Sequence, residues 1–486
     1  MFFSHTPVLP CSRALLFLLS LAPLLLCAPA VVYSQWEPDR RLTFNATSGT
    51  SPNNAWCVAA MGDSVHVVWF DRRNVDCEIY YKRSTDGGLT WGQDVQLSND
   101  PDTSQSPSLA VAGPKVHVVW WDHRDGNREI YYKRSTDGGT TWGQEIRLTN
   151  DFSYSGSPSL AASGDSVHVV WQDYRDGNLE VYYKKSTDGG SSWLSESRLT
   201  DNSSESARPS IAASGPKVHV VWYDYRDGNY EIYYKRSTDA GGTWGSDFRL
   251  SYDPAGSERP ALAVSDSMIH VVWEDYRDGT NTSEIYYKRS TNGGTSWESD
   301  TRLTYNSDWS DYPSMATSDP AVHIVWHDDR DRGSEIYYKR STDRGMTWGS
   351  DTRLTFDSAT SYRPSLAVSG PKVHVVWYDT RDGNNPPNCF EIYYKRNPTG
   401  NSGVEESSGS FYPLTSHLSF SVVPNPFTSF TAVFGHEGER FTLYDVSGRL
   451  VGKYKGDRVG EGLGAGVYFL KPEGKDAKPL RIIKLR

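Results

Sequence analysis

The sequence predicts an all-β protein whose main part is a seven-bladed β-propeller of four-stranded blades. One phrase recurs seven times: Val-His-Val-Val-Trp or a near copy, followed by an Asp-x-Arg turn and a Tyr-Tyr-Lys strand. The tryptophans of the phrase are spaced by 51 residues, except for one step of 53, and are Trp69, Trp120, Trp171, Trp222, Trp273, Trp326 and Trp377. A fixed period near 50 residues is typical of a propeller or a solenoid.

Residues 208–250 show how one repeat forms a blade. Apolar and alternating runs at 209–213, 217–222, 231–236 and 244–250 predict four antiparallel strands. Three turns separate these strands, and the second contains the Asp-Gly pair that favours a tight hairpin. Four antiparallel strands in about 50 residues make one propeller blade.

The ends of the repeat region predict how the ring closes. Trp36 stands six residues before Leu42, the spacing that Trp91 and Leu97 show in an outer strand. The seventh repeat lacks an outer strand, because Lys395-Arg396 runs directly into Asn397-Pro398. We therefore expect the N-terminal strand to complete the last blade and to leave no open sheet edge.

The chain divides into four segments. Residues 1–30 contain an apolar run and Ala28-Pro29-Ala30, which predict a secretory signal peptide with its cleavage site; Cys27 leaves lipidation as an alternative. Residues 31–396 form the propeller, 397–419 a linker rich in Ser, Gly and Glu, and 420–486 a second domain. No transmembrane segment is expected after removal of the signal. The net charge of −10, without a basic tract, argues against nucleic acid as a partner.

The third turn of the repeat carries a motif that resembles a known family. It reads Ser-Thr-Asp-Gly-Gly-Leu-Thr-Trp at 84–91, and near copies begin at Ser135, Ser186, Ser237, Ser290 and Ser341. These turns resemble the Asp-box, or BNR repeat, of sialidase-like propellers, over about residues 36–396. The resemblance implies that the boxes are structural and face away from the ligand site; their aspartates are Asp86, Asp137, Asp188, Asp239 and Asp343. This chain departs from sialidases in having seven blades and no aromatic-Arg-Ile-Pro motif.

A second resemblance covers about residues 420–486. Val423-Pro424-Asn425-Pro426-Phe427, then 443–450 and Gly466-Val467-Tyr468-Phe469, are similar to the C-terminal sorting domain of type IX secretion cargo. The resemblance implies a small immunoglobulin-like β-sandwich that is recognised by the type IX secretion machinery. It also implies a secreted or cell-surface location in a Gram-negative, Bacteroidetes-like bacterium. A generic β-sandwich accessory domain is the alternative.

Two of the cysteines lie in corresponding turns of the blades that meet at the closure. Cys77 is in the second turn of blade 1 and Cys389 in the same turn of blade 7. We expect a Cys77–Cys389 disulfide across the closure, with two separate loop cysteines as the alternative. Cys57 is expected to be a buried thiol.

The starts of the inner strands are the candidate ligand site, because the copies differ there. The aligned position holds Ala55, Ser106, Ser157, Arg208, Arg259, Tyr312 and Arg363. Arg208, Arg259 and Arg363 are the candidate ligand-binding residues, since arginines bind carboxylates by paired hydrogen bonds. Asp311, Glu258, Tyr312 and Tyr362 have the side-chain types of a sialidase centre and are weak catalytic candidates. In the alternative interpretation, the arginines bind carboxylates of neighbouring loops.

Two repeated features have simpler interpretations. The Asp-x-Arg turns are interpreted as hairpin ion pairs, with a ring of ligand sites or calcium sites as alternatives. The repeated histidines lie mid-strand in different blades, where they cannot share a metal ion. No metal and no cofactor are expected. Residues beside the repeated tryptophans vary: Phe70, Trp121, Gln172, Tyr223, Glu274, His327 and Tyr378.

The sequence favours a secreted or cell-surface module that binds glycans or proteins through one face of the ring without catalysis. The alternative is a glycoside hydrolase of the exo-sialidase type that acts on sialylated glycans. A hydrolase requires one asymmetric cluster of carboxylates, whereas near-identical copies favour binding. Fold alone does not decide between the two.

Overall fold

A computed structural model describes residues 36–44, 48–49, 57–74, 76–279, 282–331, 333–382 and 390–400 of the repeat region. Further along the chain it describes 422–423, 432–433, 440–445, 449–455, 458–459, 463–473 and 480–484. The expected signal peptide lies outside the described residues, as does the linker beyond residue 400. The chain splits into two compact units, Met1–Glu406 and Ser407–Arg486. Within these ranges no helix is long and apolar enough to cross a membrane.

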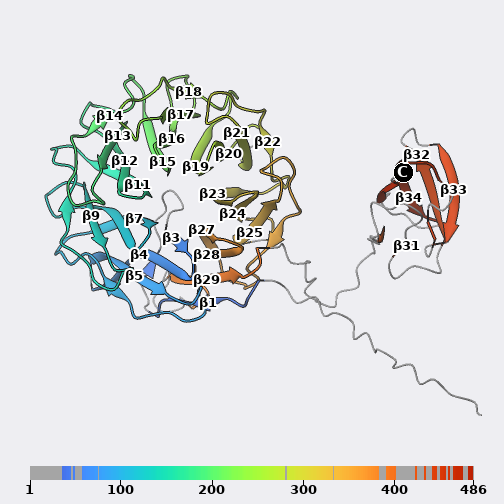
Figure 1. Cartoon of the computed structure of the whole chain (residues 1–486), viewed down its shortest axis with the longest axis horizontal. Helices are drawn as coiled ribbons and strands as arrows, with labels where there is room; N and C mark the ends of the chain where they lie inside the picture. The colour runs from blue at the N-terminus through green and yellow to red at the C-terminus, as the bar shows by residue number, and fades with distance from the viewer. Residues whose placement is uncertain are drawn as a thin grey trace, which may run out of the picture. The chain divides into compact units, whose positions relative to one another are not determined.

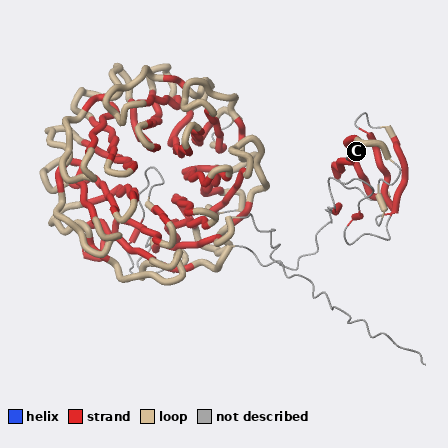
Figure 2. The backbone as a smooth tube through the Cα atoms, viewed as in Figure 1, coloured by secondary structure: helices blue, strands red, loops and turns tan. Residues whose placement is uncertain are grey.

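The first unit is a ring of seven antiparallel sheets, which confirms the predicted propeller (Figure 1; Figure 2). In blades 2 to 6 the chain runs from an inner strand near the middle of the ring to an outer strand at the rim. Blade 2 contains β7 (Ser104–Ala112), β8 (Lys115–Asp122), β9 (Glu129–Ser135) and β10 (Ile146–Arg147); blade 3 contains β11 (Ser155–Ser163), β12 (Ser166–Asp173), β13 (Glu180–Ser186) and β14 (Ser197–Arg198).

The next three blades repeat this order. Blade 4 contains β15 (Ser206–Ser214), β16 (Lys217–Asp224), β17 (Glu231–Ser237) and β18 (Phe248–Arg249); blade 5 contains β19 (Ser257–Ser265), β20 (Met268–Asp275), β21 (Glu284–Ser290) and β22 (Thr301–Arg302); blade 6 contains β23 (Ser310–Ser318), β24 (Ala321–Asp328), β25 (Glu335–Ser341) and β26 (Thr352–Arg353). The outer strands are shorter than expected, because residues such as Trp244 leave the sheet edge to pack on the preceding blade.

Blades 1 and 7 meet where the ring closes. Blade 1 contains β2 (Ser48–Gly49), β3 (Val58–Met61), β4 (Ser64–Asn74), β5 (Asp76–Ser84) and β6 (Val95–Gln96); blade 7 contains β27 (Ser361–Ser369), β28 (Lys372–Asp379) and β29 (Glu391–Asn397). The fourth strand of blade 7 is β1 (Arg40–Arg41), in which Arg40 pairs with Tyr394. Glu37 and Arg396 add an ion pair of 2.6 Å. The expected closure by the N-terminal strand is confirmed.

The hydrophobic core lies between neighbouring blades. Successive side chains of a strand point to opposite faces, so each central strand contributes to two interfaces. Between blades 3 and 4, for example, Val170 and Tyr183 pack against Ile211, Val220 and Trp222. The repeated tryptophans are fully buried in these interfaces. The ring therefore holds together by blade-to-blade packing of side chains that recur in every copy.

Each inner strand from blade 2 to blade 7 contains a β-bulge near its start. In blade 4 the pairing of β15 with β16 shifts between Ala207 and Ser210. The residue at this bulge position has a left-handed backbone, with φ of 47–53° at Ser106, Ser157, Arg208, Arg259, Tyr312 and Arg363. A bulge with this backbone redirects one side chain out of the regular alternation. Ala55, the expected counterpart in blade 1, lies outside the described residues.

The bulges and the Asp-boxes lie at opposite ends of each blade. Ser206, at the start of β15, pairs with Asp224 at the end of β16, next to the second turn. The Asp-box turn lies at the other end, where Ala240 donates to the carbonyl of Pro216. We call the end with the bulges and second turns the front face.

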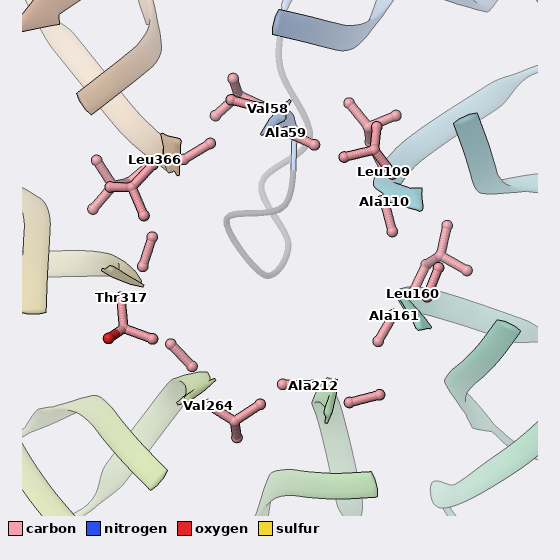
Figure 3. Close-up of a pocket in the computed structure, with 18 of the residues that line it drawn as sticks. Val58, Ala59, Leu109, Ala110, Leu160, Ala161, Ala212, Val264, Thr317 and Leu366 are labelled. Carbon is pink, nitrogen blue, oxygen red and sulfur yellow. The ribbon is translucent and has the colours of Figure 1, made fainter. Parts of the chain in front are cut away.

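The middle of the ring is lined by small apolar side chains (Figure 3). Residues such as Leu109, Ala161, Ala212, Val264 and Leu366 surround a cavity of about 240 Å³. Such a lining has almost no side chains that could hydrogen-bond a polar ligand. The cavity lining therefore offers little to a polar molecule, and the variable bulge positions of the front face are the better candidates.

The described residues of the second unit form six short strands in two sheets. They are β30 (Val422–Val423) with β31 (Ala432–Val433), and β33 (Leu450–Lys455), β32 (Arg440–Asp445), β34 (Gly466–Pro472) and β35 (Leu480–Lys484) in that spatial order. Phe441, Leu443, Val459 and Leu470 form its buried core. The immunoglobulin-like sandwich and the sorting role stay predictions.

Candidate functional site

The front face carries one asymmetric cluster, formed by blades 5, 6 and 7. Its centre is Tyr312, at the bulge position of blade 6. The guanidinium groups of Arg259 and Arg363 lie 4.5 Å and 4.6 Å from the centroid of the Tyr312 ring. Arg363 also donates a hydrogen bond of 3.2 Å to the Tyr312 hydroxyl. The bulges of three neighbouring blades thus bring two cations onto one aromatic ring.

A buried carboxylate, Glu274, supports this arrangement from behind. Glu274 lies beside the repeated tryptophan of blade 5 and is 0% exposed. It forms an ion pair with Arg259 and accepts a hydrogen bond of 2.5 Å from the backbone N–H of Tyr312. Burial, reinforced by the negative charge of Asp311, raises the pKa of Glu274 to about 8 despite the opposing effect of Arg259. Glu274 thus contacts both the backbone of the Tyr312 bulge and the guanidinium of Arg259.

Asp311 is the more accessible acid of the cluster. Its side chain is 15% exposed, and it accepts a hydrogen bond from the Ser283 hydroxyl. Burial raises the pKa of Asp311 to about 6, with smaller contributions from Asp329 and Glu258, and against the effects of Ser283 and Arg259. A carboxyl group with this pKa can hold a proton near neutral pH and release it readily, as a general acid must.

His327 completes the cluster on the side of blade 7. Its ring stacks on Tyr312 at 5.2 Å and meets the Tyr362 ring edge-on at 5.5 Å. Its Nδ1 lies 3.5 Å from the backbone nitrogen of Arg363, and its Nε2 lies 3.8 Å from Asp311. Burial and the charge of Arg363 lower the pKa of His327 to about 3, so this ring is neutral near pH 7. We name Arg259, Glu274, Asp311, Tyr312, His327 and Arg363 the Tyr312 cluster.

Three further front-face residues surround the cluster. Glu258 pairs across the sheet with Glu274, which adds a third carboxylate to this region. Tyr276 packs edge-on against Trp309 at 6.0 Å, and Trp309 is 37% exposed. An aromatic ring that is held in place and partly exposed can pack against the apolar face of a sugar. The cluster thus combines charge, acid groups and aromatic surface.

The structure separates one predicted ligand residue from the others. Arg208 lies at the bulge of blade 4, where its backbone N–H donates to Gln172 at 3.0 Å. Its side chain acts on Tyr154 and Tyr223 rather than on Tyr312. Arg259, Asp311, Tyr312 and Arg363 are brought together, and Tyr362 reaches them through His327. The three predicted arginines therefore do not form one contact cluster around Tyr312.

Within the described residues, no hydrogen bond joins the Tyr312 hydroxyl to a carboxylate, as the nucleophile pair of a sialidase would require. The Tyr312 hydroxyl accepts from Arg363, while Glu274 binds the Tyr312 backbone. The expected pairing of the arginines with nearby carboxylates applies to Arg259, whose partner is on a strand rather than in a loop. Arg208 and Arg363 form no ion pair within the described residues.

The Asp-x-Arg turns form the same structural network in successive blades. In blade 4, Trp222 Nε1 donates to Asp224 at 2.9 Å, and Arg226 binds both oxygens of Asp224 at 2.6 and 2.8 Å. Arg226 also stacks on Tyr233 and binds Asp247 at 2.8 Å. These groups satisfy one another inside the blade. Within the described residues, no group of three or more His, Cys, Asp or Glu side chains is placed to hold a metal ion.

The Asp-boxes cap their own turns on the opposite end of the blades. Asp137 accepts from the hydroxyl and backbone N–H of Thr141 at 2.6 and 2.8 Å, and from Ser135 at 2.7 Å. These hydrogen bonds hold the pKa of Asp137 well below its usual range. Trp142 packs edge-on against Tyr81 of the preceding blade at 4.9 Å. Equivalent bonds are made by Asp86, Asp188, Asp239 and Asp343, and Asn292 takes this place in blade 5.

The repeated histidines and two cysteines are buried inside the blades. His117 Nδ1 lies 2.6 Å from the Tyr132 hydroxyl, and burial lowers the pKa of His117 to about 4. Cys57 and Cys77 are both buried, and within the described residues neither forms a disulfide with the other. Arg72 Nε lies 3.0 Å from the Cys77 sulfur. Cys389, the expected disulfide partner, lies outside the described residues, so the pairing stays a prediction.

Sequence reasoning singled out the bulge positions but missed Glu274 and His327 as members of the site. Both stand immediately after a repeated tryptophan, where the copies vary. Each side chain faces the backbone N–H of the bulge residue in the following blade, which donates to it. Gln172 makes the same contact with the backbone N–H of Arg208. The position after the tryptophan and the bulge position both vary among the copies, and this joint variation could have identified Glu274 and His327.

These features place the chain among the propellers built from BNR repeats. The sequence model of the BNR repeat-like domain family matches residues 71–324, so the chain belongs to this family. Over 321 residues it is 24% identical to "Xyloglucanase Xgh74A" of Acetivibrio thermocellus, which covers 62% of this chain and 31% of that protein. The chain thus spans about a third of the length of the curated relatives that it matches.

Solved structures share the fold at low identity. Polysaccharide lyase Uly1 aligns with a TM-score of 0.51 and 10% identity, over 75% of this chain and 99% of that chain. The NanB sialidase from Streptococcus pneumoniae aligns with a TM-score of 0.42 and 13% identity, over 75% of this chain and 71% of that chain. Likeness at this level concerns the fold and not the substrate.

Proposed function

We propose that the front face of this propeller binds a glycan that carries a carboxylate, with the Tyr312 cluster as its primary site. The observation that carries the proposal is Arg363, a partly buried guanidinium on Tyr312 without an ion pair within the described residues. Arginine in this setting binds a carboxylate by paired, charge-assisted hydrogen bonds. Trp309 and Tyr362 supply aromatic surface for the sugar ring beside it.

Two independent facts support this ligand class. The chain belongs to the BNR repeat-like family, and a curated relative is named as a xyloglucanase, which supports a glycan. Arg363, which has no ion-pair partner within the described residues, supports a negative charge on that glycan. Arginines beside aromatic rings are sufficient for glycan binding, which requires no catalytic residue.

Binding is tested by titration calorimetry on the full chain with N-acetylneuraminate, galacturonate and neutral galactose. We expect an acidic sugar to bind and Arg363→Ala to weaken it at least ~10-fold, because a hydrogen bond to a charged group contributes about 1.5–3 kcal/mol. Arg344→Ala is the matched control, since it removes an exposed arginine from the Asp-box end. Equal affinity for neutral galactose, or equal loss in both variants, would contradict the proposal.

Glycoside hydrolysis is the second candidate function, and Asp311 favours it. This acid has a pKa of about 6 and lies near Glu274 and Glu258, which gives the asymmetric group of carboxylates that a hydrolase requires. We propose Asp311 as the general acid of such a reaction. An exo-sialidase mechanism receives less support, because the Tyr312 hydroxyl contacts Arg363 rather than a carboxylate.

Hydrolysis is tested with fluorogenic sialosides and glucuronides, and with Asp311→Asn as the variant. A general acid contributes about 10²–10⁴-fold to a rate, so activity should fall by that factor while sugar binding persists. Activity unchanged in Asp311→Asn would remove Asp311 from this role. Binding without turnover in the parent protein would leave the binding module as the function.

We also propose that the protein is exported and that residues 420–486 direct this step through the type IX machinery. The signal-like residues 1–30 and the sorting motifs support this location. Fractionation of cells that produce the chain with and without residues 420–486 tests it. Equal export of both forms would contradict the sorting role.

A further inference from the structure

The contacts between arginine and tyrosine continue beyond the Tyr312 cluster into blade 4. Arg208, at the bulge of that blade, lies near two tyrosine hydroxyls. Burial raises the pKa of Tyr223, while a hydrogen bond from Arg208 and the charges of Arg208 and Arg259 oppose the rise. Tyr223 is thus hydrogen-bonded to Arg208 and within range of the charge of Arg259, which belongs to the Tyr312 cluster.

The same alternation extends through blade 3 to blade 2. Tyr154, in the connection that leads into β11, feels the charges of both Arg128 and Arg208, which oppose the effect of burial on its pKa. Arg128 lies 5.6 Å from the centroid of the Tyr154 ring and 4.3 Å from that of Trp121. Gln172 ties these parts together, because it donates to the Tyr154 hydroxyl and accepts from the Arg208 backbone.

The positions that form this row are those where the seven copies differ. Arg208, Tyr312 and Arg363 occupy bulge positions, and Tyr223 follows a repeated tryptophan. Arg128 stands immediately before the glutamate of the third strand, where other blades have Leu179, Tyr230, Ser283, Ser334 and Phe390. The propeller fold therefore does not require these side chains. Each of blades 2 to 7 contributes a different arginine or tyrosine to the row.

Three of the four arginines of the row have no ion-pair partner within the described residues, although the carboxylates of Glu205 and Glu258 act on Tyr154 and Tyr223 in the same row. Arg128, Arg208 and Arg363 form no ion pair within the described residues, whereas Arg259 is paired with Glu274. In contrast, every arginine of the Asp-x-Arg turns has a carboxylate partner, as Arg226 has Asp224 and Asp247. Unpaired cations that follow one another around a face attract a ligand with several negative charges.

We infer that the alternating arginines and tyrosines from Arg128 of blade 2 to Arg363 of blade 7 form a track for a linear anionic polysaccharide. The inference rests on the proposed function and extends it: the Tyr312 cluster is one subsite, and the track binds further charged sugars of the same chain. Arginines bind the carboxylates or sulfates, and the tyrosines between them pack against the sugar rings. A polymer, rather than a single acidic sugar, is then the natural ligand class.

Single-stranded nucleic acid also binds to rows of arginines and aromatic side chains. The BNR repeat-like family match and the curated relative named as a xyloglucanase favour a glycan over a nucleic acid as the bound polyanion. The polysaccharide is therefore the occupant that the observations favour, and an oligonucleotide serves as a comparison probe.

The test is titration of the full chain with galacturonate and with oligogalacturonates of increasing length, together with an oligothymidylate. We expect affinity to rise with chain length and to weaken as salt screens the charges. Arg128→Ala should weaken binding of the long oligomer at least ~10-fold and leave the monosaccharide unchanged. Arg363→Ala should weaken both ligands, and Arg344→Ala neither.

The outcomes separate the two proposals. If galacturonate binds through Arg363 but longer oligomers bind no more tightly, or Arg128→Ala has no effect on them, the track is refuted and the primary site stands. If neither the monosaccharide nor the oligomers bind, both proposals fail. If oligothymidylate binds as tightly as the oligogalacturonate, the assignment to a polysaccharide is wrong.

Discussion

The second glycine of each Asp-box tests how neighbouring blades are held together. Gly190 has a φ of +79°, and a Cβ on it would lie 2.6 Å from Cζ of Tyr132 in the preceding blade and closer still to the hydroxyl. Tyr132 is fully buried, and its hydroxyl is held by His117 at 2.6 Å. The tyrosine therefore has no room to retreat from an added methyl group.

The expected cost of Gly190→Ala has two parts. A left-handed backbone at a residue with a Cβ costs about 1–2 kcal/mol. Overpacking against a buried ring adds about 1–3 kcal/mol, because interiors are close-packed. We therefore expect the free energy of unfolding to fall by roughly 2–5 kcal/mol in this variant.

Gly164→Ala is the matched control. Gly164 has a φ of +61°, and a Cβ there would meet nothing within 4 Å. This variant carries the backbone cost alone, about 1–2 kcal/mol. The difference between the two variants reports the contact between blades rather than backbone strain.

Urea unfolding of the full chain, followed by tryptophan fluorescence and circular dichroism, measures both variants. Tyr132→Phe in the Gly190→Ala background removes the nearest atom and should recover part of the loss, as a double-mutant cycle would show. Equal destabilisation by Gly190→Ala and Gly164→Ala would refute the reasoning, since it would mean that the tyrosine can move aside at no cost.

Three further predictions concern the site, the histidines and the closure. Protonation of Asp311, with a pKa of about 6, removes a negative charge beside the arginines; affinity for an acidic sugar should rise as pH falls through 6, and Asp311→Asn should flatten that profile in calorimetry. Burial lowers the pKa of His219 to about 4, so its contribution to stability is present above the unfolded pKa of 6.5 and is lost as pH falls towards 4. His219→Gln should reduce the pH dependence of the unfolding free energy between pH 6 and 5 by about 1 kcal/mol per pH unit. An unchanged slope in this variant would contradict the prediction. Trp36 is 7% exposed and packs edge-on against Tyr338; Trp36→Ala should cost about 3–5 kcal/mol in denaturant unfolding, whereas Trp309→Ala, a partly exposed tryptophan of the front face, should cost much less.

The architecture of the propeller was readable from the sequence because its signals are local and periodic. The recurring tryptophan phrase defined the blades, and the spacing of Trp36 and Leu42 predicted the strand that closes blade 7. The bulge positions were also found, since they differ among copies that are otherwise nearly identical. Arg259, Asp311, Tyr312 and Arg363 were named on that ground alone.

Only the tertiary structure decided which of these residues act together. Glu274 contacts Arg259 within its own blade and Tyr312 in the next, and no spacing along the chain announces such contacts. Arg208 and Arg363 share the same left-handed bulge backbone, yet Arg208 acts on Tyr154 and Tyr223 whereas Arg363 binds Tyr312, because the neighbouring side chains differ. Strand and turn patterns follow from neighbours in sequence, whereas charge and burial at the front face depend on side chains that meet only when the ring is assembled.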